Sequence, residues 1–191
     1  MPATLFSDFT CPFSYVTEAA LWRVEDEGGA AVEYRAFELY PAPARLPLGG
    51  PAAEVEAARP LADVLGLEMR PPTIAARTRK AHELARFGAA KGIGRPLRAA
   101  LFAAYFGEGR DIGRIDVLVE IAAALGLDRT ETRVVLDVDT FAAEVGRDGA
   151  EARRLGIAGT PALLLGAAPD LRLATGALSV DELRALLAGA G

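Results

Sequence analysis

The chain has 191 residues, of which 51% are hydrophobic and 25% are charged, so it has ample apolar material for one large domain or for a domain with an insertion. Its formal net charge of −5 argues against a nucleic-acid partner or an anionic membrane surface. A single cysteine excludes an intrachain disulfide, and with only one histidine beside it a cysteine- or histidine-based metal site is not expected.

The N-terminal part of the chain predicts a strand, a helix and a second strand. Residues 3–7 (ATLFS) form a short apolar run typical of a buried strand. Pro12 suits the first position of a helix, and apolar residues then recur at helical spacing until Gly28 and Gly29 end the pattern. Residues 31–37 (AVEYRAF) alternate as a strand does. These elements form a βαβ unit, so the two strands should be parallel.

The middle of the chain predicts helices only. It follows a stretch rich in proline and glycine at residues 41–51, which indicates a linker or a long loop. Apolar residues at helical spacing then predict helices over 52–65 with an interruption at Pro60, about 73–91, 95–106, 115–125 and 130–136. We interpret residues 51–136 as an inserted helical domain.

The C-terminal part returns to a mixed pattern. Residues 140–155 predict a helix that ends at Gly156, although Gly146 and Gly149 within it weaken the pattern. An apolar strand at 161–166 should pair with an alternating strand at 171–175 across a turn at 168–170. Ser179 and Glu182 form a capping box that opens the last helix.

The assembled order is β-α-β, a helical block, then α-β-β-α. This is the thioredoxin arrangement, so the predicted fold class is α/β, a thioredoxin fold with an inserted all-helical domain. The thioredoxin-like domain would be discontinuous, over residues 1–50 and 137–191, with the insertion at 51–136.

Cys11 stands where the first strand gives way to the first helix. A thiol at a helix N-terminus faces unpaired backbone N–H groups and the positive end of the helix dipole, which stabilise a thiolate and should lower its pKa. Pro12 presets the backbone, and the hydroxyl of Ser14, about one turn on, can donate a hydrogen bond to the sulfur. A structural cysteine is equally consistent with this location, because free cysteines are commonly buried.

Thr160 and Pro161 form a second candidate feature. A proline directly before an apolar strand removes a hydrogen-bond donor from the sheet, and X-Pro bonds adopt the cis form far more often than other peptide bonds. A cis bond here would expose the backbone of Thr160 to an extended peptide or to glutathione. In a thioredoxin arrangement this loop lies beside the helix that follows Cys11.

Five segments carry a resemblance to a known family. They occur in the order SDFTCPFSY (7–15), YRAFELYP (34–41), AHELARF (81–87), AYFGEGRDIG (104–113) and GIAGTP (156–161). Together they resemble the FrnE-like branch of the DsbA-family thioredoxin-fold oxidoreductases over nearly the whole chain. The same superfamily contains 2-hydroxychromene-2-carboxylate isomerases and kappa-class glutathione transferases. The resemblance implies a nucleophile at Cys11 and a cis-proline at Pro161.

The motif departs from the family pattern at Ser14, because the dithiol enzymes of this branch have a second cysteine there. In those enzymes the second thiol resolves the mixed disulfide, and a serine hydroxyl cannot. We therefore predict a DsbA-like thiol-disulfide oxidoreductase of monothiol type. Two alternatives stay open: a glutathione-dependent isomerase or transferase acting on a small aromatic substrate, and a non-enzymatic peptide-binding protein of thioredoxin fold.

The predicted site residues divide into two groups. Those assigned to catalysis are Cys11, Pro12 and Ser14. Those assigned to substrate binding are Phe13, Thr160, Pro161 and His82. For His82 the other interpretation is an ordinary hydrogen-bonded residue at a domain interface. A further hypothesis is that arginines hold a glutathione carboxylate, with these candidates: Arg77, Arg79 and Arg86.

The expected partners follow from the same chemistry. We expect no metal and no tightly bound cofactor, with glutathione as a candidate co-substrate and a protein or small-molecule thiol or disulfide as substrate. Nucleic acid and membrane partners are not expected, and analogy with the isomerases and kappa transferases indicates a homodimer. Since no apolar run approaches a membrane span and the N-terminus lacks the basic residues of a signal peptide, we expect a cytoplasmic location.

Overall fold

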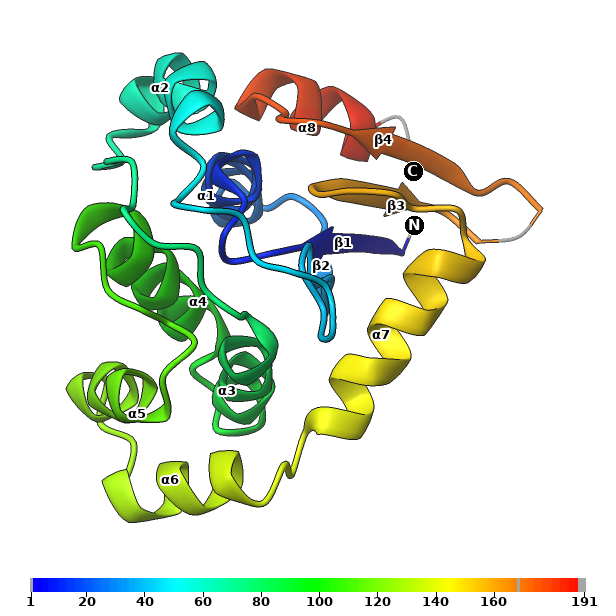
Figure 1. Ribbon diagram of the computed structural model, residues 1–191. Helices are drawn as coiled ribbons and strands as arrows, with labels where there is room; N and C mark the ends of the chain where they lie inside the picture. The colour runs from blue at the N-terminus through cyan, green and yellow to red at the C-terminus, as the bar shows by residue number, and fades with distance from the viewer. Residues whose placement is uncertain (1, 168, 189–191) are drawn as a thin grey trace.

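A four-stranded sheet lies at the centre of one half of the molecule. The computed structural model describes residues 2–167 and 169–188 (Figure 1). The strands are β1 (Ala3–Ser7), β2 (Val32–Ala36), β3 (Ala162–Leu165) and β4 (Arg172–Thr175), in the order β2-β1-β3-β4. β1 and β2 are parallel, as predicted, while β3 is antiparallel to both β1 and β4.

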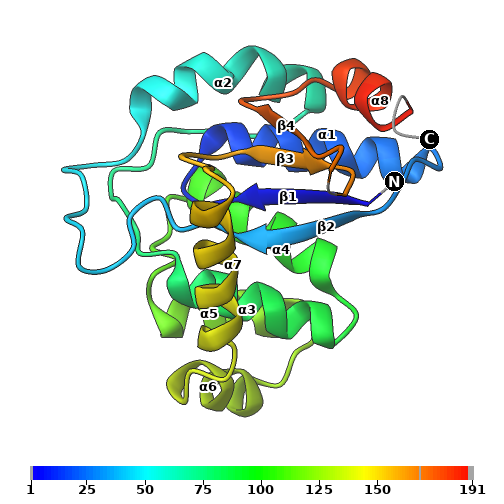
Figure 2. The ribbon, with the colours of Figure 1, turned by 90° about the vertical axis from the view of Figure 1, so that its right-hand side faces the viewer.

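Helices cover both faces of this sheet. Alternate residues of β1 point to opposite faces, because side chains alternate along a strand. Leu5 packs with α1 (Pro12–Asp26) and α8 (Val180–Ala188). Phe6 packs on the other face with Ala152 of α7 (Ala142–Arg154), and Figure 2 shows α7 crossing this face. The layers confirm the predicted α/β thioredoxin fold.

The remaining helices lie between β2 and α7 in the chain. They are α2 (Ala52–Leu65), α3 (Arg79–Ala90), α4 (Gly94–Phe102), the π-helical turn η1 (Ala103–Gly107), α5 (Ile115–Ala124) and α6 (Arg129–Asp137). α3 packs against α4, α5 and α6, whereas α2 packs against α1 and lies near α8 (Figure 1). The predicted boundaries at 50/51 and 136/137 stay a prediction.

A buried ion pair joins α4 to the sheet layer. The guanidinium of Arg98 donates to both carboxylate oxygens of Glu18 on α1, at 2.5 and 2.6 Å, and to the hydroxyl of Ser7 at 2.8 Å. It also lies 4.8 Å from the ring centre of Phe9 and 4.9 Å from that of Tyr34. The Glu18 side chain is fully buried, so this pair fixes how the two layers meet.

The predicted helix over 73–91 begins later, at Arg79, because tertiary contacts hold the preceding segment outside a helix. Arg70 donates its backbone N–H to the Phe106 carbonyl at 2.7 Å. The Ile74 carbonyl accepts from the Tyr105 hydroxyl at 2.8 Å. Arg77 donates to backbone carbonyls of the loop after β2. None of these partners is local in sequence, so the pattern of apolar residues carried no sign of them.

The predicted interruption at Pro60 is absent, and the two glycines that weaken the later helical pattern do not break that helix. α2 runs through Pro60 without a break, because the buried residues on either side of it still pack inward. α7 likewise includes Gly146 and Gly149. The capping box is confirmed, since Ser179 and Glu182 exchange hydrogen bonds between side chain and backbone. Ala168 of the predicted 168–170 turn lies outside the described residues. Within the described part of the chain, no helix has the length and apolar character needed to cross a membrane.

Candidate functional site

Cys11 is the N-cap residue of α1, as the sequence predicts, with an extended backbone at φ −92° and ψ 113°. The turn from β1 to α1 is built around Asp8. The Asp8 carboxylate accepts hydrogen bonds from the N–H and the hydroxyl of Thr10 at 2.8 and 2.9 Å. The backbone carbonyl of Asp8 accepts from the Cys11 N–H at 3.1 Å. These bonds satisfy the polar groups of a tight turn and place the cysteine at the start of the helix.

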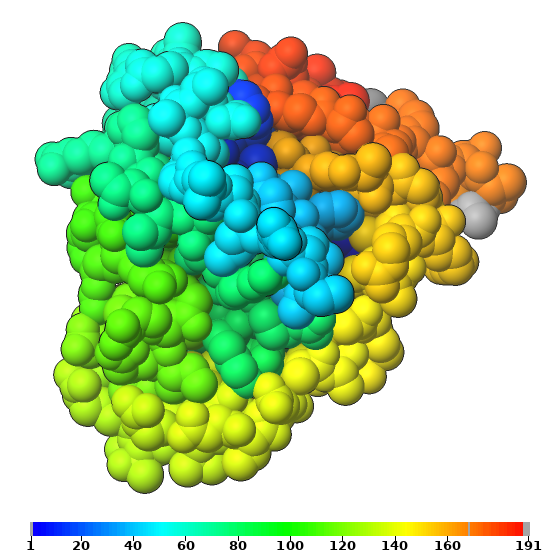
Figure 3. Space-filling view, in the orientation of Figure 1, coloured from blue at the N-terminus to red at the C-terminus, as the bar shows by residue number. Residues whose placement is uncertain are grey.

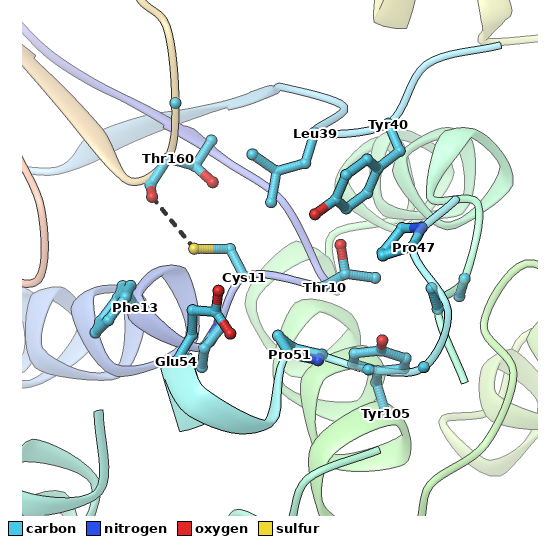
Figure 4. A pocket seen from close by; sticks show the side chains of 16 residues that line it. Thr10, Cys11, Phe13, Leu39, Tyr40, Pro47, Pro51, Glu54, Tyr105 and Thr160 are labelled. Atoms are coloured by element: carbon cyan, nitrogen blue, oxygen red, sulfur yellow. Dashed lines mark hydrogen bonds between the residues drawn. The ribbon is translucent and has the colours of Figure 1, made fainter. Parts of the chain in front are cut away.

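The Cys11 sulfur lies against the loop that precedes β3. Its thiol donates to the carbonyl of Thr160 over 3.2 Å, although the two residues are 149 positions apart in the chain. The Thr160–Pro161 peptide bond is cis, as predicted for Pro161. Figure 4 shows this contact as a dashed line. The fold therefore brings together the two features that the sequence singled out separately.

The predicted low pKa of the Cys11 thiol is wrong for this arrangement. Burial raises the pKa of the thiol above its ordinary value, since Cys11 is only 4% exposed and a thiolate loses its hydration there. Contacts with Ser14 and Thr160 act in the opposite direction, and their effect is smaller. The sequence showed the helix N-terminus but not the residues that cover it.

Ser14 lies fully buried behind the thiol. Its hydroxyl accepts from the Asp8 N–H at 3.4 Å. Hydrogen bonding with Ser14, through its side chain and its backbone N–H, lowers the pKa of Cys11. Ser14 therefore favours the thiolate form of Cys11, while its predicted hydrogen bond to the sulfur stays a prediction.

A cavity of about 370 Å³ opens beside Cys11. Of the predicted residues, Cys11, Pro12, Phe13 and Thr160 line it. The sequence did not single out the rest of its lining: Thr10, Leu39, Tyr40, Pro47, Gly49, Gly50, Pro51, Glu54, Ala75, Ala76, Tyr105 and Gly159. In Figure 4, Thr160 and Leu39 lie on one side of Cys11, with Glu54 and Pro51 on the other. Figure 3 shows the light-blue loop after β2 on the surface between the helices and α7.

His82 lies outside this cavity. Its side chain is 2% exposed, its ring centre is 4.9 Å from that of Phe9, and it lines a separate cavity with Arg86 and Arg98. Burial first, and the positive charge of Arg98 next, hold the pKa of His82 well below its usual range. The structure places His82 on α3 against Phe9, and its buried Nε2 has no hydrogen-bond partner among the described residues, so this nitrogen does not show the ordinary hydrogen-bonded role.

The arginines considered for glutathione also have other partners. Arg77 donates to the carbonyls of Tyr40 and Ala44 at 2.8 and 2.6 Å. Arg79 pairs with Glu38 at 2.7 Å, and Arg86 pairs with Asp148. None of the three lines the described Cys11 cavity, so the predicted carboxylate clamp is not formed there.

Comparison of the sequence with known proteins found a matching family and a related protein. A model of the DSBA-like thioredoxin domain matches residues 4–188. An uncharacterized protein, YwbO, from Bacillus subtilis is 30% identical over 144 residues, or 72% of each chain.

Solved structures show the same fold. A probable DsbA oxidoreductase from Streptomyces coelicolor superposes with a TM-score of 0.83 at 25% identity, over 100% of this chain and 89% of that one. A 2-hydroxychromene-2-carboxylate isomerase gives 0.76 at 19% identity, covering 99% and 94%. The cytosolic disulfide reductase DsbM from Pseudomonas aeruginosa, with GSH, gives 0.70 at 19%, covering 91% and 89%. The last two likenesses show the fold alone.

Proposed function

Since the chain belongs to the DSBA-like thioredoxin domain family, we propose that it is a monothiol thiol-disulfide oxidoreductase with Cys11 as its nucleophile. One observation carries the proposal. The sulfur of Cys11, the only cysteine of the chain, lies 3.2 Å from the carbonyl oxygen of Thr160, which precedes a cis-proline. Cys11 and Thr160 line the same cavity. A disulfide bound in this cavity would lie beside both the Cys11 sulfur and the backbone of Thr160.

The first step is attack by Cys11 on a substrate disulfide. The thiol loses its proton to solvent, and the Ser14 contacts and the first turn of α1 stabilise the thiolate. The thiolate forms a bond to one sulfur of the substrate, and the bond between the two substrate sulfurs breaks. The second substrate sulfur leaves as a thiolate and takes up a proton from water.

The second step needs a thiol from outside the chain. Ser14 cannot resolve the mixed disulfide, since its hydroxyl is far too weakly acidic to act as the thiolate does. An external thiolate instead attacks the substrate sulfur, and Cys11 leaves as a thiolate. The external thiol and the substrate sulfur end as a disulfide, so sulfur and electrons balance. Glutathione is a chemically adequate thiol of this kind, and no tightly bound cofactor enters the cycle.

A cytoplasmic location fits this cycle, because the thiol pool of the cytoplasm supplies the resolving reagent. The proposed substrates are protein or small-molecule disulfides, and a homodimer stays a prediction by analogy. For the isomerase or transferase alternative the support is the shared fold, which does not determine chemistry. The peptide-binding alternative would use the Thr160 carbonyl as its acceptor, and in this structure that carbonyl already accepts a hydrogen bond from the Cys11 thiol.

The test follows Cys11 through the cycle. Intact-mass spectrometry after treatment with a small disulfide should show one mixed disulfide, and added thiol should remove it. Cys11→Ser should abolish exchange, whereas Ser14→Ala should retain it at a reduced rate. Turnover of disulfides by Cys11→Ser would contradict the proposal, and peptide binding that ignores this substitution would favour the non-enzymatic alternative.

A further inference from the structure

We infer that the Cys11 cavity selects disulfides and thiols that are uncharged or positively charged over those that carry an excess of carboxylates, such as glutathione. This inference rests on the proposed exchange at Cys11 and adds the class of co-substrate. It opposes the expectation that glutathione is the natural partner.

The first observation is the charge of the cavity wall. Among the described residues that line it there is no lysine, arginine or histidine. Glu54 is the single carboxylate, on the first turn of α2. The other polar groups are the hydroxyls of Thr10, Tyr40, Tyr105 and Thr160, and most of the remaining wall is proline, glycine, alanine and other apolar residues. The cavity therefore offers hydrogen bonds but no counter-charge to an anion.

The second observation concerns the arginines around the cavity, whose charges are used elsewhere. Arg77 holds the loop after β2 through two carbonyls. Arg79 pairs with Glu38, and together with Arg153 it lines a different cavity, between α7 and the segment that follows β2. Neither the Arg77 nor the Arg79 guanidinium lines the Cys11 cavity, so a carboxylate bound beside Cys11 meets neither of them in the cavity wall.

The third observation concerns the helix ends at the cavity. The positive end of α1 lies at the Cys11 sulfur, where hydrogen bonding with Ser14 lowers the pKa of the thiol. The positive end of α2 already has the Glu54 carboxylate in its first turn. Pro12 and Pro51, at these two helix starts, carry no N–H to donate. Each helix start therefore has one N–H donor fewer for a ligand carboxylate, and the start of α2 already lies beside a negative charge.

The consequence is a difference in free energy between ligand classes. Glutathione carries more carboxylates than ammonium groups, and each carboxylate that leaves water without a partner costs free energy. Repulsion from Glu54 adds to this cost. A neutral or cationic thiol makes the same apolar and hydroxyl contacts but has neither the cost of burying a carboxylate nor the repulsion from Glu54. The specificity therefore arises because the described cavity wall has no cationic side chain.

The experiment uses the full chain and its one cysteine as the only reactive thiol. Second-order rates of mixed-disulfide formation are measured for oxidised glutathione and for the disulfide of glutathione diethyl ester, which has the same skeleton without the carboxylates. Each rate is divided by the rate for the same protein unfolded in urea, which removes the intrinsic reactivity of the disulfide. We expect the normalised rate for oxidised glutathione to be about tenfold lower, a difference of about 1.4 kcal/mol.

Matched variants locate the origin of the difference. Glu54→Gln removes the carboxylate of the cavity, and we expect it to narrow the ratio about threefold. Glu56→Gln makes the same charge change two residues further along α2, where Glu56 pairs with Arg59 at 2.6 Å outside the cavity. This control should leave the ratio unchanged.

The outcomes separate the inference from the proposed function. If folded protein reacts with oxidised glutathione as fast as with its ester, after normalisation, the charge selection is wrong while exchange at Cys11 stands. An equal effect of Glu54→Gln and Glu56→Gln would also overturn it, since the cause would be the overall charge. If the folded chain reacts with neither disulfide, the proposed function fails as well.

Discussion

Asp8 is a buried carboxylate three residues before Cys11. Besides its bonds to Thr10, it accepts from the Leu39 N–H and from the Thr78 hydroxyl, at 2.6 and 3.1 Å. It thereby ties the β1–α1 turn to the loop after β2 and to the start of α3. Burial raises the pKa of Asp8 to about 6, against the effect of these hydrogen bonds.

The raised pKa of Asp8 predicts how stability changes with pH. Because the folded pKa exceeds the ordinary value, protonation favours the folded chain, and this contribution is complete below pH 3.8 and lost as pH rises through about 6. A shift of this size corresponds to about 3 kcal/mol in the free energy of unfolding. We expect the free energy of unfolding of the wild type, measured in urea and relative to that of Asp8→Asn, to fall as pH rises over this range. A constant difference between pH 4 and 7 would contradict the prediction.

Asp8 also acts on the thiol. Its negative charge contributes to the raised pKa of Cys11, after the larger effect of burial. We therefore expect Asp8→Asn to lower the pKa of the thiol, measured from the pH dependence of alkylation of the single cysteine. Asp116→Asn, an exposed change on α5, is the control and should have no effect. An unchanged or higher thiol pKa in Asp8→Asn would show that the carboxylate does not act on the sulfur.

At this scale the sequence predicted positions better than properties. The strand, the proline and the helical spacing placed Cys11 at a helix start, because each of these signals is local. The pKa of its thiol depends on burial, to which distant residues such as Thr160 contribute. The same reason explains why Asp8 drew no attention, since its partners Leu39 and Thr78 lie 31 and 70 residues away.

Among the elements, α4 and α1 depend on one buried ion pair. Arg98→Met would leave the Glu18 carboxylate buried without its partner, and we expect a loss of about 3–5 kcal/mol in the free energy of unfolding. The double variant Glu18→Gln with Arg98→Met removes both charges and should be more stable than Arg98→Met alone. Chemical denaturation of Arg98→Met, Glu18→Gln and the double variant tests this, and strictly additive losses would mean that the pair is not coupled.

The loop after β2 is the element that closes the cavity, and Arg77 holds it. We expect Arg77→Gln to slow exchange at Cys11 about tenfold through weaker disulfide binding, because hydrogen bonds from a charged group contribute roughly 1.5–3 kcal/mol. The pKa of the Cys11 thiol should stay unchanged, which separates loss of binding from loss of reactivity. Arg70→Gln, whose side chain pairs with Glu68 at the surface, is the control. Exchange at the wild-type rate in Arg77→Gln would show that the loop is held without it.

The helices show where sequence patterns end. α5 and α6 match their predicted ranges to within one residue at each end, and α8 begins at its predicted capping box, because apolar spacing and capping residues determine these helices locally. The start of α3 at Arg79 was missed because Arg77 and the residues before it contact other segments. The cavity wall was missed for the same reason, since Tyr40, Glu54 and Tyr105 come from separate elements.

Across the whole molecule, the proposed site forms where distant parts of the chain meet. The β1–α1 turn supplies Cys11, the loop before β3 supplies Thr160, and the segments between β2 and η1 supply most of the remaining wall. The family resemblance predicted the first two, and it implied the fold that brings them together. Only the complete fold forms the cavity, so reactivity that depends on the cavity should vanish when the chain unfolds.

The central claim is that Cys11 exchanges disulfides without a second thiol in the chain. The most direct measurement is a redox titration of the folded protein with a small neutral thiol and its disulfide, followed by intact-mass spectrometry. The account predicts one reversible mixed disulfide per chain, formed at Cys11 and removed by excess external thiol. A folded protein whose thiol stays free at every ratio, or that turns over disulfides after Cys11→Ser, would contradict it.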